Sequence, residues 1–201
     1  GRSKSRKVYV VDLPGFGGSN IPKVESIFEY SELVVQFCKY LKIEKLTVIG
    51  HSLGGRVAIV LASKYREMIE QVVLIDPAGV KQISFKRSIL KLLAKIFAFV
   101  PRSLRLKLVS HMMDGDYRNS PKLRELYRAV VKDDLRKNLR QIQCPTLLMW
   151  GENDKVLPVT LTKIYRKYLT DVTVKIVWGA GHDPHLSHFD QSKTILQENI
   201  L

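Results

Sequence analysis

A serine stands between glycines where a strand pattern turns directly into a helix pattern, and few folds accept such a corner. Residues 47–58 read TVIGHSLGGRVA: an apolar run, a corner of small residues, then apolar residues at helical spacing. So sharp a turn forces its central residue, Ser52, into a strained conformation, and the positions around it must be small. Gly50, Gly54 and Gly55 supply that space. The pattern G-x-S-x-G in this context predicts that the Ser52 hydroxyl is held at the carboxyl end of a sheet.

A serine hydroxyl needs two further groups before it can act as a nucleophile at neutral pH. It needs a base that takes its proton, and the base needs an acid that orients it. Asp154 lies in the loop WGENDKVLP after one apolar run, and His182 lies in GAGHDPH after another. If both runs are strands of one parallel sheet, these residues lie at the same sheet edge as Ser52. The sequence therefore predicts Ser52 as nucleophile, His182 as base and Asp154 as acid.

Strand and helix patterns alternate along the chain, which predicts an α/β fold with a mostly parallel sheet. Residues 81–143 interrupt this alternation with a block that reads as entirely helical. We therefore expect a core of residues 1–80 and 144–201 with an inserted helical sub-domain. The expected strands are 7–12, 45–49, 71–75, 145–150 and 172–178, and the expected core helices are 25–41, 53–65, 159–168 and one from about 188.

Four segments of the chain resemble the marker segments of the α/β-hydrolase fold family. They are DLPGFGGS at 12–19, GHSLGG at 50–55, WGEND at 150–154 and GHDPHL at 181–186. They resemble the branch that contains carboxylesterases, C–C bond hydrolases, epoxide hydrolases and haloalkane dehalogenases. The last two carry aspartate at the corner, whereas this chain carries Ser52, which favours acyl transfer to water. The resemblance covers essentially the whole chain and makes the helical block 81–143 the family's cap.

Other residues of the chain could also serve as the acid or the base. Asp76 ends the strand expected at 71–75, where some relatives place the acid, but the loop of Asp154 carries the G-x-x-D pattern of the family. His51 is expected to point away from Ser52 because it is its neighbour in the corner. The other histidines are interpreted as surface or core residues: His111, His185 and His188.

A hydrolase of this kind also needs two backbone N–H groups that stabilise the developing oxyanion. Leu53, directly after the nucleophile, is expected to supply one of them. The resemblance places the other in a loop after a strand upstream of Asp12, yet only six residues precede the first expected strand. Either the chain is an N-terminally truncated fragment, which we favour, or strands 7–12 and 45–49 pair directly. A fragment is expected to be unstable or poorly active alone, because buried unpaired backbone groups cost about 1–3 kcal/mol each.

Composition limits the partners and the compartment. The formal net charge is +14, but the basic residues are spread along the chain and no nucleic-acid motif is present. A solvated basic surface is therefore the preferred interpretation. The two cysteines lie far apart in apolar settings, which predicts two buried thiols in a reducing compartment, hence the cytoplasm. No apolar run approaches the roughly 20 residues of a membrane span.

A basic stripe within the expected cap gives one reason to consider a membrane surface. Arg87, Lys91 and Lys95 recur every four residues beside an apolar helix face. Such a helix could dock on anionic lipid, although an ordinary cap helix with its basic side toward water is the preferred interpretation.

Together these features predict a serine hydrolase that cleaves an ester or related acyl bond of a small apolar molecule. The residues imply no metal and no cofactor. Two alternatives stay open: a C–C bond hydrolase of the same fold, and a non-catalytic hydrolase-fold protein that binds a ligand or partner.

Overall fold

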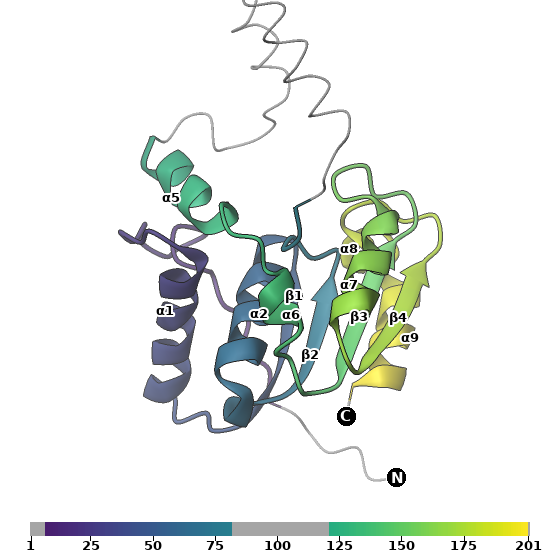
Figure 1. Cartoon of the computed structure of the whole chain (residues 1–201), viewed down its shortest axis with the longest axis horizontal. Coiled ribbons are helices and arrows are strands. Elements are labelled where there is room, and N and C mark those ends of the chain that lie inside the picture. The colour runs from purple at the N-terminus through teal and green to yellow at the C-terminus, as the bar shows by residue number, and fades with distance from the viewer. Residues whose placement is uncertain (1–6, 82–120, 201) are drawn as a thin grey trace, which may run out of the picture.

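A four-stranded parallel sheet in the order β1-β2-β3-β4 forms the centre of the molecule (Figure 1). The structure is a computed structural model that describes residues 7–81 and 121–200. The strands are β1 Leu46–His51, β2 Ile69–Ile75, β3 Thr146–Gly151 and β4 Val172–Val177. The predicted α/β fold with a parallel sheet is confirmed.

The strand register brings the carboxyl ends of all four strands to one edge. His51 is paired with Ile75, Ile75 with Met149, and Gly151 with Val177. Because the strands run in the same direction, the loops that follow them open at this edge. These loops carry the residues that the sequence singles out as chemically active.

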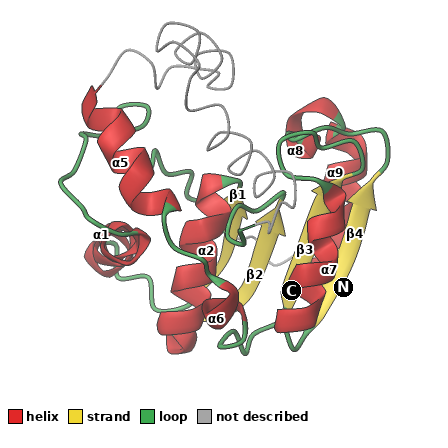
Figure 2. Ribbon diagram, turned by 45° about the horizontal axis from the view of Figure 1, so that its top comes forward, coloured by secondary structure: helices red, strands yellow, loops and turns green. Residues whose placement is uncertain are grey.

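Helices lie on both faces of the sheet, and the inner strands β2 and β3 are almost wholly buried between them, whereas Ile49 of the outer strand β1 is 50% exposed. The larger core lies between the sheet and the helices in front of it, among them α2 and α7 (Figure 2). A smaller core contains Val73, Leu147 and Met149 and packs against residues of α9 and its C-terminal flank. The helices are α1 Ile27–Tyr40, α2 Leu53–Lys64, α5 Pro121–Val131, α6 Arg136–Leu139, α7 Thr162–Tyr168, α8 Pro184–Ser187 and α9 Phe189–Asn199, with short 3-10 helices at Arg66–Met68 and Val159–Leu161.

The strand predicted for residues 7–12 is wrong. This segment is irregular, and the side chains of Val8 and Val10 are 79% and 94% exposed. A strand persists only with a neighbour that completes its hydrogen-bond ladder. Within the described ranges β1 pairs with β2 alone, so direct pairing of residues 7–12 with β1 does not occur.

A buried arginine joins α2 to the end of the inserted block. Arg56 is only 4% exposed, and its guanidinium donates to the carbonyls of Val130 at 2.8 Å and Asp133 at 2.6 Å. Burial lowers the pKa of Arg56. The last turn of α5 and the residues after it are thereby fixed against α2, the helix that begins directly after Ser52.

Other predictions about the inserted block fall partly outside the described residues. The basic stripe of Arg87, Lys91 and Lys95 lies there. The domain limits at 81 and 143 stay a prediction.

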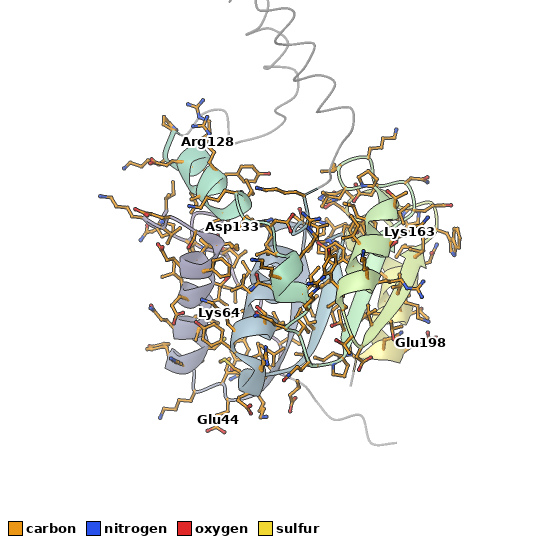
Figure 3. All side chains as sticks on the ribbon, in the orientation of Figure 1. Glu44, Lys64, Arg128, Asp133, Lys163 and Glu198 are labelled. Atoms are coloured by element: carbon orange, nitrogen blue, oxygen red, sulfur yellow. The ribbon has the colours of Figure 1, made fainter. Side chains whose placement is uncertain are left out.

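Every helix in the described part is too short or too polar to cross a bilayer. Five of the charged side chains labelled in Figure 3 are exposed at the surface: Glu44, Lys64, Arg128, Lys163 and Glu198.

Candidate active site

The corner between β1 and α2 holds Ser52 in a strained conformation, as predicted. Its φ of 49° and ψ of −110° lie outside the regions that a residue with a Cβ ordinarily occupies. Three backbone hydrogen bonds fix this geometry. The Ser52 N–H donates to the carbonyl of Ile75 at 3.1 Å, and the Ser52 carbonyl accepts from Gly55 and Ala78 at 3.0 Å each. The strain is thus held in place by α2 and by the loop after β2.

At two of the three glycine positions around Ser52, the surrounding atoms leave no room for a Cβ. A Cβ on Gly50 would lie 2.3 Å from the carbonyl oxygen of Gly54, and a Cβ on Gly55 would lie 2.7 Å from the Cβ of Pro77. Gly54 differs, because no described atom lies within 4 Å of the position where its Cβ would be. The prediction that all three must be small is therefore wrong for Gly54.

The structure brings the three predicted residues together in one hydrogen-bonded chain. His182 Nε2 lies 3.1 Å from Ser52 Oγ, and His182 Nδ1 lies 2.7 Å from Asp154 Oδ2. Ionised carboxylates only accept, so Nδ1 carries the proton of a neutral His182. Nε2 is then the free acceptor, and it faces the serine hydroxyl. This is the arrangement in which an imidazole can take a proton from Ser52.

The side chain of Asp154 is buried and surrounded by hydrogen-bond donors. Its side chain has no exposed surface, so its charge depends on hydrogen bonds within the protein. Oδ1 accepts from the backbone N–H groups of Val156 at 2.7 Å and Leu157 at 2.8 Å, and Oδ2 accepts from His182. These three donors compensate the buried negative charge.

His51 contacts the base rather than the nucleophile. Its Nε2 donates to the backbone carbonyl of His182 at 2.8 Å and lies 3.5 Å from Asp183 Oδ1. Burial is the main cause that lowers the pKa of His51. His51 therefore joins the corner at Ser52 to the loop that carries His182. Sequence reasoning missed this contact, because nothing in the local pattern places the two loops side by side.

Asp76, the rival acid, lies at the same edge. It directly follows β2, is fully buried, and accepts from the Gly151 N–H at 2.9 Å through Oδ1. Its Oδ2 has no hydrogen-bond partner in the part of the chain that the structure describes. Burial, and then the neighbouring carboxylates of Asp154 and Asp183, raise the pKa of Asp76 to about 8, although the Gly151 N–H opposes this. A carboxyl group with this pKa is mostly protonated at pH 7.

One polar atom from each of Asp76, Asp154 and His182 falls within 4.8 Å of the others. This is the one group of three potential metal ligands among residues 7–81 and 121–200. Asp154 and His182 already bond directly at 2.7 Å, so we interpret the group as a hydrogen-bonded cluster.

The raised pKa of Asp76 predicts a pH dependence of stability. In the folded chain Asp76 keeps its proton up to its pKa of about 8. In the unfolded chain an aspartate has a pKa of about 3.9. Between these values the folded state binds more protons, so the free energy of unfolding falls as the pH rises, by up to about 1.4 kcal/mol per unit. Urea unfolding at several pH values should show the natural chain losing stability relative to Asp76→Asn as pH rises. A difference in the free energy of unfolding between the two proteins that does not change with pH would contradict the raised pKa of Asp76.

Leu53 is the first residue of α2. The first N–H groups of an α-helix have no acceptor within the helix, and the helix N-terminus favours negative charge. The Leu53 N–H is thus placed where an oxyanion next to Ser52 could accept it, and its role stays a prediction.

Comparison with known proteins shows what the chain is similar to. The model of a family described as "Alpha/beta hydrolase family" matches residues 1–191. A Mycoplasma pneumoniae protein named "Putative esterase/lipase 2" is 28% identical over 195 residues, which cover 88% of this chain and 72% of that protein. The monoacylglycerol lipase ABHD6 of Rattus norvegicus is 24% identical over 211 residues, covering 89% of this chain and 63% of the lipase.

Solved structures of low sequence identity share the fold. The meta-cleavage product hydrolase CumD from Pseudomonas fluorescens IP01 is 20% identical and superposes with a TM-score of 0.66. The superposition covers 92% of this chain and 76% of CumD. At this level of identity the similarity concerns architecture alone.

Proposed function

The chain belongs to the alpha/beta hydrolase family, and we propose that it is a serine hydrolase that cleaves carboxylic esters. The observation that carries this proposal is the continuous hydrogen-bonded chain from Ser52 through His182 to Asp154. A strained serine at the end of a strand, a base in contact with it and a buried acid behind the base form the constellation that acyl transfer needs.

The proposed reaction proceeds through an acyl-enzyme. Ser52 Oγ attacks the ester carbonyl carbon while His182 Nε2 takes the hydroxyl proton, and Asp154 stabilises the resulting imidazolium. The Leu53 N–H donates to the oxyanion. Collapse of the tetrahedral intermediate breaks the C–O bond, and His182 returns the proton to the leaving alcohol. Water, deprotonated by His182, then attacks the acyl group and releases the acid and the free serine.

An apolar acyl ester is the substrate class that we propose. The named relatives include a monoacylglycerol lipase and a protein named as an esterase/lipase, and both names describe ester cleavage. We further propose that the insertion at 81–143 acts as the cap over the substrate, with residues 1–80 and 144–201 as the catalytic core.

Ester turnover tests this function. The purified chain, although expected to be poorly active alone, should hydrolyse p-nitrophenyl esters and a monoacylglycerol at a measurable rate, and Ser52→Ala should lower that rate by at least about 10³-fold. Asp190→Asn, an exposed change in the first turn of α9, serves as the control and should keep the natural rate. A folded protein that turns over no ester would favour one of two alternatives. Cleavage of a diketone-like acid would indicate a C–C bond hydrolase, and no turnover at all would indicate a binding role.

A further inference from the structure

Two fully buried carboxyl groups lie side by side at the ends of adjacent strands. Asp76 follows β2, Asp154 lies in the loop after β3, and these strands pair directly. Asp76 is 0% exposed, and so is the side chain of Asp154. A carboxyl oxygen of each lies within 4.8 Å of the other and of a ring nitrogen of His182. Neither side chain is therefore exposed to bulk solvent.

Two negative charges so close together in a buried site repel each other strongly. Carboxyl pairs of this kind share one proton at neutral pH, because both cannot ionise at acceptable cost. The Asp183 carboxylate adds negative charge that also raises the pKa of Asp76. The pair therefore holds one proton, and the question is which residue carries it.

The hydrogen bonds decide where the proton lies. Asp154 accepts from three donors, namely the Val156 N–H, the Leu157 N–H and His182 Nδ1. Among residues 7–81 and 121–200, the Asp76 carboxyl accepts only from Gly151, and its Oδ2 is buried without a partner. Donors stabilise the ionised form, so the charge belongs on Asp154 and the proton on Asp76. Protonation would give the unpartnered Asp76 oxygen a hydrogen to donate, and the Asp154 carboxyl, which has an oxygen within 4.8 Å of one of Asp76, is the acceptor nearby.

We propose that Asp76 is a positioning residue that stays protonated and donates a hydrogen bond from Oδ2 to the carboxylate of Asp154. This proposal rests on the proposed roles of Ser52, His182 and Asp154. Asp76 does not touch the reacting atoms; it acts through Asp154, by fixing the orientation and the ionised state of the acid that orients His182.

Three variants separate this role from the role of an ionised acid. Asp76→Asn keeps an N–H donor toward Asp154 and an oxygen toward Gly151, and asparagine tolerates the positive φ of 39° at this position. We expect it to retain kcat within about threefold, because a neutral amide reproduces the neutral carboxyl. Asp76→Leu has a similar size but no donor, and its kcat should fall about 10- to 100-fold with KM little changed. Asp154→Asn should lose far more than either.

The pH dependence of kcat and an infrared measurement distinguish this role from a merely structural one, because a structural role would change neither. The kcat of the natural protein should fall above about pH 8, where the pKa of Asp76 lies. The kcat of Asp76→Asn should not fall there. Infrared spectra at about pH 6, where a free aspartate is almost wholly ionised, should show a protonated carboxyl band. That band should shift on 13C-aspartate labelling and vanish in Asp76→Asn.

Several results would overturn the proposal. Collapse of activity in Asp76→Asn to the level of Asp154→Asn would make Asp76 the ionised acid instead. Absence of a protonated aspartate band in the natural protein would also overturn it, even if Asp76→Leu failed to fold. The infrared readout needs no turnover, so it distinguishes failure of this inference from failure of the proposed function, which Ser52→Ala tests alone.

Discussion

Asp154→Asn is expected to lower kcat for ester hydrolysis by about 10⁴-fold while the chain stays folded. The reason lies in the donors around this side chain. The N–H groups of Val156 and Leu157 require an acceptor, so the amide oxygen of the asparagine would face them. Its NH₂ group would then face His182 Nδ1 and force that nitrogen to accept. The His182 proton would move to Nε2, which could no longer take the proton of Ser52.

Steady-state kinetics with a p-nitrophenyl ester measures this loss, with circular dichroism as the check on folding. Asp190→Asn removes one exposed carboxylate from α9 and serves as the charge-matched control, which should keep full activity. Activity of Asp154→Asn within about tenfold of the natural protein would be far from the loss of a triad acid. That outcome would move the acid role away from Asp154.

Gly50→Ala is the substitution expected to damage the fold of the site most. The new Cβ would lie 2.3 Å from the carbonyl oxygen of Gly54 and 2.8 Å from the nitrogen of Gly55, both backbone atoms that cannot rotate away. The corner would have to open, so we expect a loss of about 3 kcal/mol or more in the free energy of unfolding. For a chain of this size such a loss lowers Tm by roughly 6–12 °C. Displacement of Ser52 should also abolish ester turnover.

Gly54→Ala provides the matched control, because its Cβ would enter open space among the described residues. Alanine is also the better helix former at this position in the first turn of α2, so stability should stay within about 1 kcal/mol or rise. Thermal unfolding followed by circular dichroism measures both variants. Equal Tm values for Gly50→Ala and Gly54→Ala would show that the corner is looser than its geometry indicates.

The local patterns of the sequence predict most of the sheet and its active edge. The inner strands β2 and β3 carry near-continuous apolar runs, which is typical of strands covered on both faces. The parallel order of the four strands then places Ser52, Asp154 and His182 at one edge, and the structure brings these residues into contact. Periodicity is sufficient here because each of these residues directly follows, or lies a few residues beyond, the end of its own strand.

Features that depend on contacts between distant segments could not be predicted in this way. Residues 7–12 carry a strand pattern, but a pattern cannot supply the ladder partner that a strand needs. The contact of His51 with the His182 carbonyl depends on how two loops fold toward each other. The pairing of Asp76 with Asp154 depends on the neighbour relation of β2 and β3, which are separated by the whole inserted block. In each case the deciding term is packing or register between segments, which local spacing does not encode.

The central claim is that Ser52 is a nucleophile activated by His182, and labelling with a fluorophosphonate probe tests it most directly. Such probes react with a serine whose hydroxyl is activated by an adjacent base. The account predicts one covalent label, located on the peptide that contains Ser52 by mass spectrometry, and its loss in Ser52→Ala and His182→Ala. A folded protein that takes up no label, or one labelled equally in Ser52→Ala, would contradict it.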